Sequence, residues 1–383
     1  MTIKINKFLI LFLVMLSCFS IGLWDKQIPI TGLANLLKWP LFLSLIPIML
    51  IFRKAHVVVS NNIISWCASV FIVVISYSTI TSPYLDATGL QYLIGYIVLF
   101  LLGFVLPIPA NNNISDEILA KAMGWLAITV CLFSVLSLFS SFGWLGTRFK
   151  GIYGNPNGMG SIAVIAVIFS TTLFSGAFKF KSWLVVGIIF SCALCFLFSQ
   201  SRGAMLAIAM CTLIYLVAER KVKLFLLVFV GFGLVLGIMN ALDIGSQGNF
   251  QQREYKMEVD DARKHIFKIH YRLISEKPLL GQGLSGNESG GRYPAELAYT
   301  DILSFAGFIG GGAFIFALFY MAYRGFFLLK NGNKYYKANY LIFIAILTMS
   351  AGDGYISNIG NPLPIFAWLI MGNLSRHIYR PNS

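Results

Sequence analysis

The feature that most constrains this chain is a succession of apolar runs, each about as long as a lipid bilayer is thick. Hydrophobic residues make up 57% of the 383 residues, charged residues only 11%, and the mean hydropathy is +0.77. A soluble fold of this size does not cover so much apolar surface with so few charges, whereas a spanning helix needs roughly 20 mostly apolar residues. The sequence therefore predicts an all-α, polytopic membrane protein of about 12 transmembrane helices. We expect these near 8–24, 33–52, 63–80, 90–107, 118–142, 157–175, 182–199, 203–218, 224–241, 297–320, 338–352 and 362–375.

Basic residues gather in alternate turns between these runs. The net charge is +14, an excess that in a soluble protein suggests binding to nucleic acid. Concentration on one side of the membrane is instead what the positive-inside rule describes, so we expect both chain ends in the cytoplasm and no nucleic-acid partner. The residues on that side are 16 of the 29 Lys and Arg: Lys4, Lys7, Arg53, Lys54, Lys121, Lys179, Lys181, Arg220, Lys221, Lys223, Arg324, Lys330, Lys334, Lys337, Arg376 and Arg380.

Cysteine and histidine show no metal-ligand spacing. All six cysteines lie inside apolar runs, where a free thiol behaves as a small hydrophobic group. Cys192 and Cys195 form a C-x-x-C pair without a second pair of ligands, and the four histidines are scattered. We expect neither a metal nor another cofactor.

Residues 242–296 interrupt the pattern with one long polar segment. They carry eight basic and eight acidic residues, and a loop of this length in a compact fold is usually functional. Long loops also escape the positive-inside bias, so this one can lie on the outer side. We divide the chain into transmembrane helices 1–9 at 1–241, the outer loop at 242–296, and transmembrane helices 10–12 with a cytoplasmic tail at 297–383.

Ionisable residues at the outer membrane surface are costly there and are therefore functional candidates. The segment before the sixth span combines Arg148 and Lys150 with an Asn-Pro turn that precedes Asn157. If Asn157 caps the following helix, the helix N-terminus and the two cations form an anion site. An ordinary capped turn explains the same residues equally well.

A very short turn separates the seventh and eighth spans, so Arg202 must lie at the membrane surface. With Ser201 beside it at the start of a helix, Arg202 suits a phosphate group. The alternative is an arginine that extends from the membrane toward water without binding a ligand.

Within the outer loop, residues 260–274 predict an amphipathic helix capped by Asp260 or Asp261. We expect this helix to lie on the membrane surface, where Arg272 and the other basic residues can contribute to substrate binding. A plain interfacial helix is the alternative. The side chains spaced to share one face are Arg263, Phe267, His270 and Ile274.

The start of the tenth span carries Arg292, Glu296, Tyr299 and Asp301. A carboxylate at this place can act as a general base, which makes Glu296 and Asp301 catalytic candidates. Alternatively, the helix dipole simply favours acidic residues here. Asp353 lies on the same side, where the eleventh span ends.

The outer side thus presents arginines from at least three separate segments together with one or two carboxylates. Arginine forks match phosphate oxygens, and they can stabilise a leaving diphosphate without a metal as negative charge develops on it. This combination indicates a substrate that carries a pyrophosphate group.

Four local motifs, in their order and spacing, resemble the O-antigen ligase and polymerase superfamily of bacterial envelope polysaccharide assembly. The helix count and the long loop between the ninth and tenth spans extend this resemblance over most of the chain. The motifs are Arg148-Phe-x-Gly151 with Gly154-Asn155-Pro156-Asn157, Ser199-x-Ser201-Arg202-Gly203-Ala204, Arg263 ahead of Pro278-Leu-x-Gly281-x-Gly283, and the Gly307-x-x-Gly310 helix.

The resemblance implies a metal-independent glycosyltransferase with a GT-C-like helical architecture in the bacterial inner membrane. Donor and acceptor would be undecaprenyl-diphosphate-linked glycans on the periplasmic face, so that the outer loop is periplasmic. It also implies that Arg148, Arg202 and Arg263 contact the diphosphates and glycans. Further expected substrate contacts are Lys150, Asn157, His270, Arg272, Arg292 and Tyr299, and the expected catalytic residues are Arg263, Glu296 and Asp301.

Ligases of this superfamily carry His-Asn ahead of the Gly-x-x-Gly helix, where this chain has Glu296-Leu297. We therefore expect a Wzy-type polymerase of polysaccharide repeat units, with a ligase that transfers glycan to lipid A core as the alternative of the same class. A lipid-linked-oligosaccharide flippase is the alternative of another class, although transporters usually bind substrate near the midplane between internal repeats. Membrane lipid is an expected partner, and a chain-length regulator and a flippase are further candidates.

Overall fold

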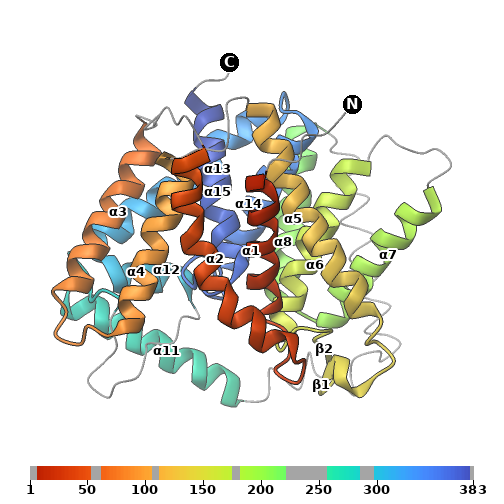
Figure 1. Ribbon diagram of the computed structural model, residues 1–383, viewed down its shortest axis with the longest axis horizontal. Helices are drawn as coiled ribbons and strands as arrows, with labels where there is room; N and C mark the ends of the chain where they lie inside the picture. The colour runs from red at the N-terminus through yellow and green to blue at the C-terminus, as the bar shows by residue number, and fades with distance from the viewer. Residues whose placement is uncertain are drawn as a thin grey trace.

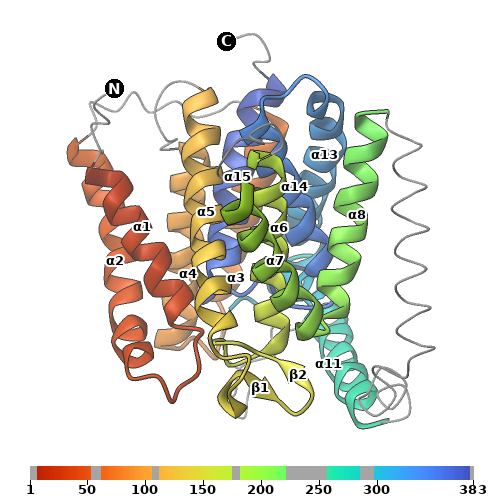
Figure 2. The same cartoon turned by 90° about the vertical axis from the view of Figure 1, so that its right-hand side faces the viewer.

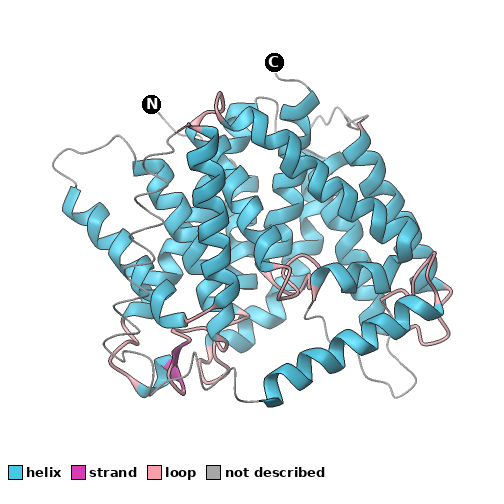
Figure 3. Ribbon diagram, turned by 180° about the vertical axis from the view of Figure 1, so that it is seen from behind, coloured by secondary structure: helices cyan, strands magenta, loops and turns pink. Residues whose placement is uncertain are grey.

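The computed structural model describes residues 7–52, 62–105, 112–174, 182–220, 257–284 and 297–379. Within these ranges the ordered elements are helices apart from one two-stranded sheet. Figure 3 shows that helices make up the whole body of the molecule, with the short hairpin near one edge. The prediction of an all-α fold is confirmed.

The first part of the chain forms a series of helices joined by short connections. A π-helical turn, η1 (Leu101–Val105), continues α4, and a short 3-10 turn, η2 (Ser141–Gly143), leads into an antiparallel hairpin of β1 (Trp144–Leu145) and β2 (Arg148–Phe149). The helices are α1 (Lys7–Ile21), α2 (Ile30–Phe52), α3 (Ile63–Ile80), α4 (Ala87–Phe100), α5 (Asn112–Val135), α6 (Pro156–Phe174), α7 (Ser182–Ser199) and α8 (Arg202–Ala218).

The second part begins with the amphipathic helix α11 (Met257–Glu276). A continuous helical stretch follows, in which a π-helical turn, η3 (Gly307–Gly311), joins α12 (Ala298–Ala306) to α13 (Gly312–Leu329). The chain then folds back through α14 (Lys334–Met349) and α15 (Pro362–Tyr379). The predicted tenth span is therefore α12, η3 and α13 together.

Every predicted span overlaps a helix except 224–241, which lies outside the described residues, although the bounds differ by several residues at some helices such as α5. α2 runs through both Pro40 and Pro47, so these prolines do not end it. Among the described residues, five helical segments are long and apolar enough to cross a membrane: Ile30–Pro47, Ile63–Ile80, Ala87–Val105, Asp116–Val135 and Ala298–Leu329. Further apolar helices are shorter, among them Pro156–Thr172 and Arg202–Ala218. The chain is a multi-pass membrane protein, and the count of twelve crossings stays a prediction.

The upright helices form a bundle with two different ends. The start of α1 and the end of α15 lie at one end, which we call the terminal end (Figures 1 and 2). The β1–β2 hairpin and α11 lie at the opposite end, the hairpin end, where α11 crosses the bundle at a large angle to the upright helices (Figure 1). Because the helices alternate in direction, α6, α8 and α12 all begin at the hairpin end.

Aromatic packing fixes the centre of the bundle. The ring of Phe314 in α13 stacks on both Phe71 of α3 and Trp368 of α15, with centroid distances of 4.6 Å and 4.9 Å. α15 also approaches η1 closely, since a Cβ on Gly372 would lie 1.9 Å from the carbonyl oxygen of Gly103. A core packed this tightly holds the helix ends in fixed positions.

A buried polar cluster joins α5, α14 and α15 at the terminal end. Asp116 is fully buried, and Nε2 of His377 lies 2.9 Å from its carboxylate oxygen Oδ2. The amides of Asn339 and Asn373 also donate to Asp116, the former to its backbone oxygen at 3.0 Å. A carboxylate buried in this way is stable only because several donors surround it.

Candidate active site

The hairpin end brings together residues that the sequence presented separately. α6 packs directly on the α7–α8 turn, since a Cβ on Gly160 would lie 2.7 Å from the Cβ of Ser201. The loop 350–361 between α14 and α15 reaches the same place through Asp353, whose Oδ1 lies 3.5 Å from Nδ2 of Asn157. Arg148, Asn157, the turn that carries Arg202, and Asp353 therefore form one cluster, the Arg148 cluster.

The cap of α6 lies two residues before the predicted one. Asn155 caps the helix, because its Oδ1 accepts the N–H of Asn157 at 2.8 Å and its carbonyl accepts the N–H of Met159 at 3.1 Å. Pro156 takes the first helical position, where an N–H is not needed. The prediction that Asn157 caps the helix is wrong. Its side chain is used for tertiary contacts instead.

The guanidinium of Arg148 connects β2 to two helical elements. Its Nε donates to the carbonyl of Ser199 at 3.1 Å, and Nη2 donates to Oδ1 of Asn157 at 2.6 Å. A longer contact of 3.5 Å joins Nη2 to the carbonyl of Gln200. Arg148 thus fixes the end of α7 against the start of α6, with separate N–H groups directed at separate acceptors.

The α7–α8 turn contains only Gln200 and Ser201. Gln200 has a φ of +49°, a left-handed conformation that costs a non-glycine residue roughly 1–2 kcal/mol. Ser201 caps α8 by accepting the N–H of Ala204 at 3.4 Å. Arg202 is the first residue of α8 and is exposed. An exposed guanidinium at a helix N-terminus is suited to bind a phosphate.

Lys150 is paired within the protein. Its ammonium group forms an ion pair with Asp25 in the α1–α2 connection, and both side chains are only 12–13% exposed. The N–H of Gln27 and the Lys150 ammonium lower the pKa of the Asp25 carboxyl group. The backbone strengthens the connection, since Asp25 donates its N–H to Ile152 at 2.9 Å. This pairing does not support the predicted substrate contact of Lys150, which instead anchors the segment after β2.

Asp353 is the partly exposed carboxylate of the cluster. Besides the contact with Asn157, a Cβ on Gly203 would lie 3.9 Å from Oδ2 of Asp353, so the carboxylate faces the first turn of α8. Tyr355, two residues further on, is buried, and burial together with the Asp353 carboxylate raises the pKa of its phenol.

A second polar cluster, the His270 cluster, lies where α11 meets the start of α12. His270 is 1% exposed, with Nδ1 2.8 Å from Oγ1 of Thr300 and Nε2 3.2 Å from Oδ1 of Asp301. Asp301 is fully buried, and its Oδ2 accepts a hydrogen bond from Ser357 at 2.6 Å. Asp301 therefore joins α11 to the loop 350–361.

The loop 350–361 takes part in both clusters. Asp353 contacts Asn157 in the Arg148 cluster, and Ser357 contacts Asp301 in the His270 cluster. Tyr96 of α4 also donates to the carbonyl of Ser357 at 2.6 Å, which fixes this loop on the central core. The position of α11 is therefore linked to that of Asp353 through a few hydrogen bonds.

The orientation of α11 differs from the prediction. From residue 264 onward, its buried side chains are Ile266, His270 and Leu273, whereas Phe267 is 53% exposed although it was expected on the same face as His270. The hydrogen bonds of His270 and the aliphatic residues on either side of it determine the rotation of the helix. Because α11 begins at Met257, the predicted caps Asp260 and Asp261 lie inside the helix rather than before it.

Two glycine motifs explain how α11 is anchored. Gly281 and Gly307 have φ values of +72° and +60°, which favour glycine. A Cβ on Gly281 would lie 2.5 Å from the carbonyl carbon of Phe305, and one on Gly307 would lie 2.3 Å from that of Leu279. Backbone hydrogen bonds join the same segments, including the N–H of Phe308 to the carbonyl of Pro278 at 2.7 Å. The segment after α11 therefore packs backbone against backbone on α12 and η3.

The remaining predicted site residues either make contacts other than those of the Arg148 cluster or lie outside the described residues. Tyr299 donates its hydroxyl to the carbonyl of Leu347 at 2.8 Å, so it joins α12 to α14. Arg272 is exposed, with Nε 3.7 Å from the carboxylate of Glu276. Arg292 and Glu296 lie outside the described residues, and of Arg263 only the backbone, in α11, is described.

Several residues of the site carry no sequence signal. Ser357 and Gln200 belong to common residue types in unremarkable surroundings, and Asp25 lies far along the chain from Lys150. In the described ranges, no three His, Cys, Asp or Glu side chains are grouped so that they could hold a metal ion. What the site offers is an exposed guanidinium, a helix N-terminus and a carboxylate. These groups can bind a diphosphate and accept a proton.

Comparison with known proteins assigns part of this chain. Residues 186–315 match the family model described as O-antigen ligase. This stretch contains most of α7, all of α8, and α11 with its glycine-anchored segment on α12 and η3. A search of curated proteins found no match. This match supports a relation of residues 186–315 to the O-antigen ligase and polymerase superfamily.

Proposed function

We propose that the chain is a glycosyltransferase that joins lipid-diphosphate-linked glycans at the hairpin end of its bundle, and that it acts as a polysaccharide polymerase. The observation that carries this proposal is the Arg148 cluster. It places an exposed arginine at the start of α8, an arginine-ordered turn and a partly exposed carboxylate at one end of a membrane bundle. The match of residues 186–315 to O-antigen ligase supports glycan transfer.

The donor diphosphate binds at the start of α8 in this proposal. A helix start leaves backbone N–H groups without intrahelical partners, and Ser201 occupies only that of Ala204. Arg202 adds a guanidinium beside them. When the bond from the sugar to the diphosphate breaks, its electron pair leaves with the diphosphate, and these donors stabilise the developing charge. Arg148 acts indirectly by holding the turn, and Arg263, Arg272 and Arg292 of the loop remain candidates for further diphosphate contacts.

The acceptor hydroxyl loses its proton to a carboxylate as its oxygen bonds to the anomeric carbon of the donor. Asp353 suits this role because it is partly exposed beside Asn157 and the first turn of α8. Glu296 is the second candidate. Asp301 is fully buried and held by His270 and Ser357, so we assign it a positioning role.

The test is complementation of a strain that lacks this gene. Arg202→Ala at normal protein level should abolish the ladder of long polysaccharide chains, because the leaving diphosphate loses its guanidinium. Arg324→Ala, which removes an arginine of α13, serves as the matched control and should restore the full ladder. A full ladder from Arg202→Ala would exclude the assigned role.

A ligase is the second candidate, and the description of the matched family favours it. The two activities leave different products behind. Loss of a polymerase leaves single repeat units on lipid A core, whereas loss of a ligase leaves finished polymer on its lipid carrier. Separation of core-linked from carrier-linked glycan in the null strain distinguishes them.

A further inference from the structure

Gln200 has a backbone conformation that its residue type does not favour. Among the described residues, Gln200 and Arg220 are the non-glycine residues with a positive φ, at +49° and +56°. Both follow the end of a helix. The N–H of Gln200 bonds to the carbonyl of Leu197 at 3.2 Å, and the N–H of Arg220 bonds to that of Val217 at 3.1 Å. Glycine is the residue most often found at such a position, because it has no Cβ.

The two positions differ in what their side chains contribute to the fold. Arg220 lies just after the C-terminus of α8, where a cation stabilises the helix dipole. Gln200 is uncharged and gains no such stabilisation at the end of α7. The contact from Arg148 is to the backbone carbonyl of Gln200, a group that glycine also carries. Neither effect explains why this position holds a glutamine.

The turn presents Gln200 on the same side as Arg202. Ser199 and Ser201 are 0% and 2% exposed and face α6, where a Cβ on Gly160 would lie 2.7 Å from an atom of each. Gln200 is partly exposed and Arg202 is exposed, so these alternate residues lie on the outer side of the turn. Within the described part of the chain, the carboxamide of Gln200 has no hydrogen-bond partner.

A carboxamide at this place suits a sugar better than a phosphate. It carries two N–H donors and one carbonyl acceptor, so it can bond to neighbouring hydroxyl groups, each of which both donates and accepts. Because it is uncharged, its hydrogen bonds to a diphosphate are weaker than those of the nearby guanidinium of Arg202. The outer side of the turn therefore combines a phosphate-binding group with a hydroxyl-binding group.

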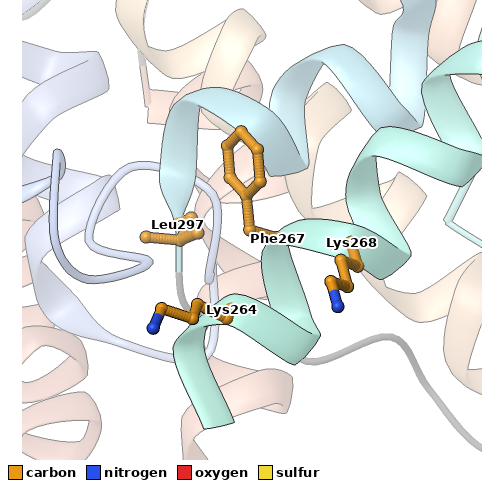
Figure 4. A pocket seen from close by; sticks show the side chains of 4 residues that line it. All are labelled: Lys264, Phe267, Lys268 and Leu297. Carbon is orange, nitrogen blue, oxygen red and sulfur yellow. The ribbon is translucent and has the colours of Figure 1, made fainter. Parts of the chain in front are cut away.

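A hollow between α11 and the start of α12 is less suited to recognise a sugar. Lys264, Phe267, Lys268 and Leu297 line it, and both ammonium groups are turned away from it (Figure 4). Sugar hydroxyls lose their hydrogen bonds to water on binding and need polar partners in exchange. The lining of this hollow does not provide such partners, whereas the α7–α8 turn does.

We propose that the carboxamide of Gln200 binds hydroxyl groups of the sugar attached to the donor diphosphate and thereby contributes to the choice of sugar. This inference rests on the proposed function, which places the diphosphate on Arg202 at the start of α8. The strained backbone is then retained because it holds the carboxamide beside Arg202. Gln200 is a specificity residue, separate from the groups that stabilise the leaving diphosphate or accept a proton.

Stability and kinetics of the full chain in detergent test this role together. Gln200→Gly relieves the backbone and removes the carboxamide, so the midpoint of thermal unfolding should not fall. The substrate is the lipid-diphosphate-linked glycan extracted from the null strain. Its KM should rise roughly threefold to tenfold with kcat unchanged, as expected when a hydrogen bond to the bound substrate is lost. Gln200→Met keeps the length of the side chain without its hydrogen bonds and should raise KM by a similar factor.

Two controls separate a sugar contact from other effects. Arg220→Gly makes the equivalent backbone change at the end of α8 and should leave KM and kcat unchanged. A prenyl diphosphate without sugar serves as a competitive inhibitor. It should inhibit Gln200→Gly and the wild-type chain equally, because the carboxamide contacts the sugar and not the diphosphate.

Every other outcome overturns the inference. An unchanged KM in Gln200→Gly would show that the carboxamide does not bind the glycan. A lower kcat at constant KM, or a lower unfolding midpoint, would mean that Gln200 acts on the geometry of the turn. Weaker inhibition of Gln200→Gly by the prenyl diphosphate would assign the contact to the diphosphate. Absence of transfer by the wild-type chain is a separate result, because it refutes the proposed function and this inference with it.

Discussion

Arg148 and Gln200 show how single residues shape the start of α8. The left-handed backbone of Gln200 makes the two-residue turn possible. Arg148 offsets the energetic cost of this conformation by donating hydrogen bonds to the carbonyls of Ser199 and Gln200. Strained residues at binding sites persist where the surroundings hold them in place. We therefore propose that Arg148, which the sequence suggests as a phosphate ligand, acts mainly by holding the turn that positions Arg202.

Replacement of Arg148 by lysine tests this distinction. Lysine keeps the charge but carries a single nitrogen atom. It therefore cannot donate to Asn157 and Ser199 from two separate nitrogens, as Nη2 and Nε of Arg148 do. Arg148→Lys should therefore lower polymer yield at least tenfold, almost as much as Arg148→Ala, in the complementation assay. Normal yield with lysine would instead mean that charge alone is required, and that Arg148 contacts the substrate.

The pair of Lys150 and Asp25 gives a pH-dependent prediction. The pKa of Asp25 is lowered from 3.8 in the folded protein, so its contribution to stability is complete above that pH and is lost as the pH falls through the folded-state pKa. Asp25→Asn should lower the free energy of unfolding at pH 7 by about 2–4 kcal/mol, because it leaves the Lys150 ammonium largely buried without its partner. Thermal unfolding in detergent, recorded at pH 7 and near pH 3, should show this difference shrinking at the lower pH. An equal difference at both values would contradict it.

At the scale of elements, α11 is held from two directions. The His270 cluster fixes its rotation, and the segment 277–284 fixes its end by packing on η3. Beside His270, the buried side chains of Ile266 and Leu273 add an apolar contact, whereas Phe267 is exposed. Over its described side chains the helix is thus attached through specific polar and backbone contacts and two buried aliphatic residues.

Substitution of Gly307, one of the two interlocking glycines, should show the strength of the second connection. Gly307→Ala places a Cβ 2.3 Å from a backbone carbon at a positive φ, so unfolding free energy should fall by about 2 kcal/mol or more. Gly187→Ala in α7, where a Cβ meets nothing within 4 Å, is the control and should be neutral or slightly stabilising. The measurement is the midpoint of thermal unfolding for each purified variant.

The first connection is tested by a pair of histidines in the same helix. His270→Ala removes the contacts to Thr300 and Asp301, so backbone amides of α11 should exchange with deuterium faster and polymer yield should fall. His265→Ala changes an exposed histidine of α11 and should alter neither quantity. Unchanged exchange in His270→Ala would show that α11 is held without this cluster.

At the scale of the whole molecule, the two ends of the bundle carry different chemistry. The terminal end has basic residues near the surface, such as Lys121 and Lys334 beside the ring of Tyr335, above the buried cluster of Asp116. The hairpin end has the exposed Arg202, the carboxylate of Asp353 and the lysines of α11. We propose that the terminal end is cytoplasmic and the hairpin end periplasmic, in a bacterial inner membrane.

Labelling of single cysteines tests this orientation. Ser275→Cys lies on the exposed side of α11, and Lys330→Cys lies between α13 and α14. A membrane-impermeant maleimide added to intact spheroplasts should label the first and should reach the second only after permeabilisation. The reverse pattern would invert the topology and remove the basis for a periplasmic site.

The sequence predicts much of the fold because apolar runs are local. The span at 63–80 and the short turn before Arg202 follow directly from the lengths of these runs. Tertiary pairings are different. The contact of Ser357 with Asp301 and the rotation of α11 about His270 arise only when distant segments pack, so the sequence placed Phe267 on the wrong face and assigned Asp301 a base role that its burial does not suit.

The packing of Gly281 and Gly307 has a consequence for how this protein can change. Each glycine leaves room for the backbone of the other's segment, so a Cβ added at either position would collide with the backbone of the opposite segment. The sequences of the two segments must therefore match each other. A chimera that exchanges the outer loop with that of another protein should fold only when 277–284 and 307–311 come from the same parent, whatever sugars each parent joins.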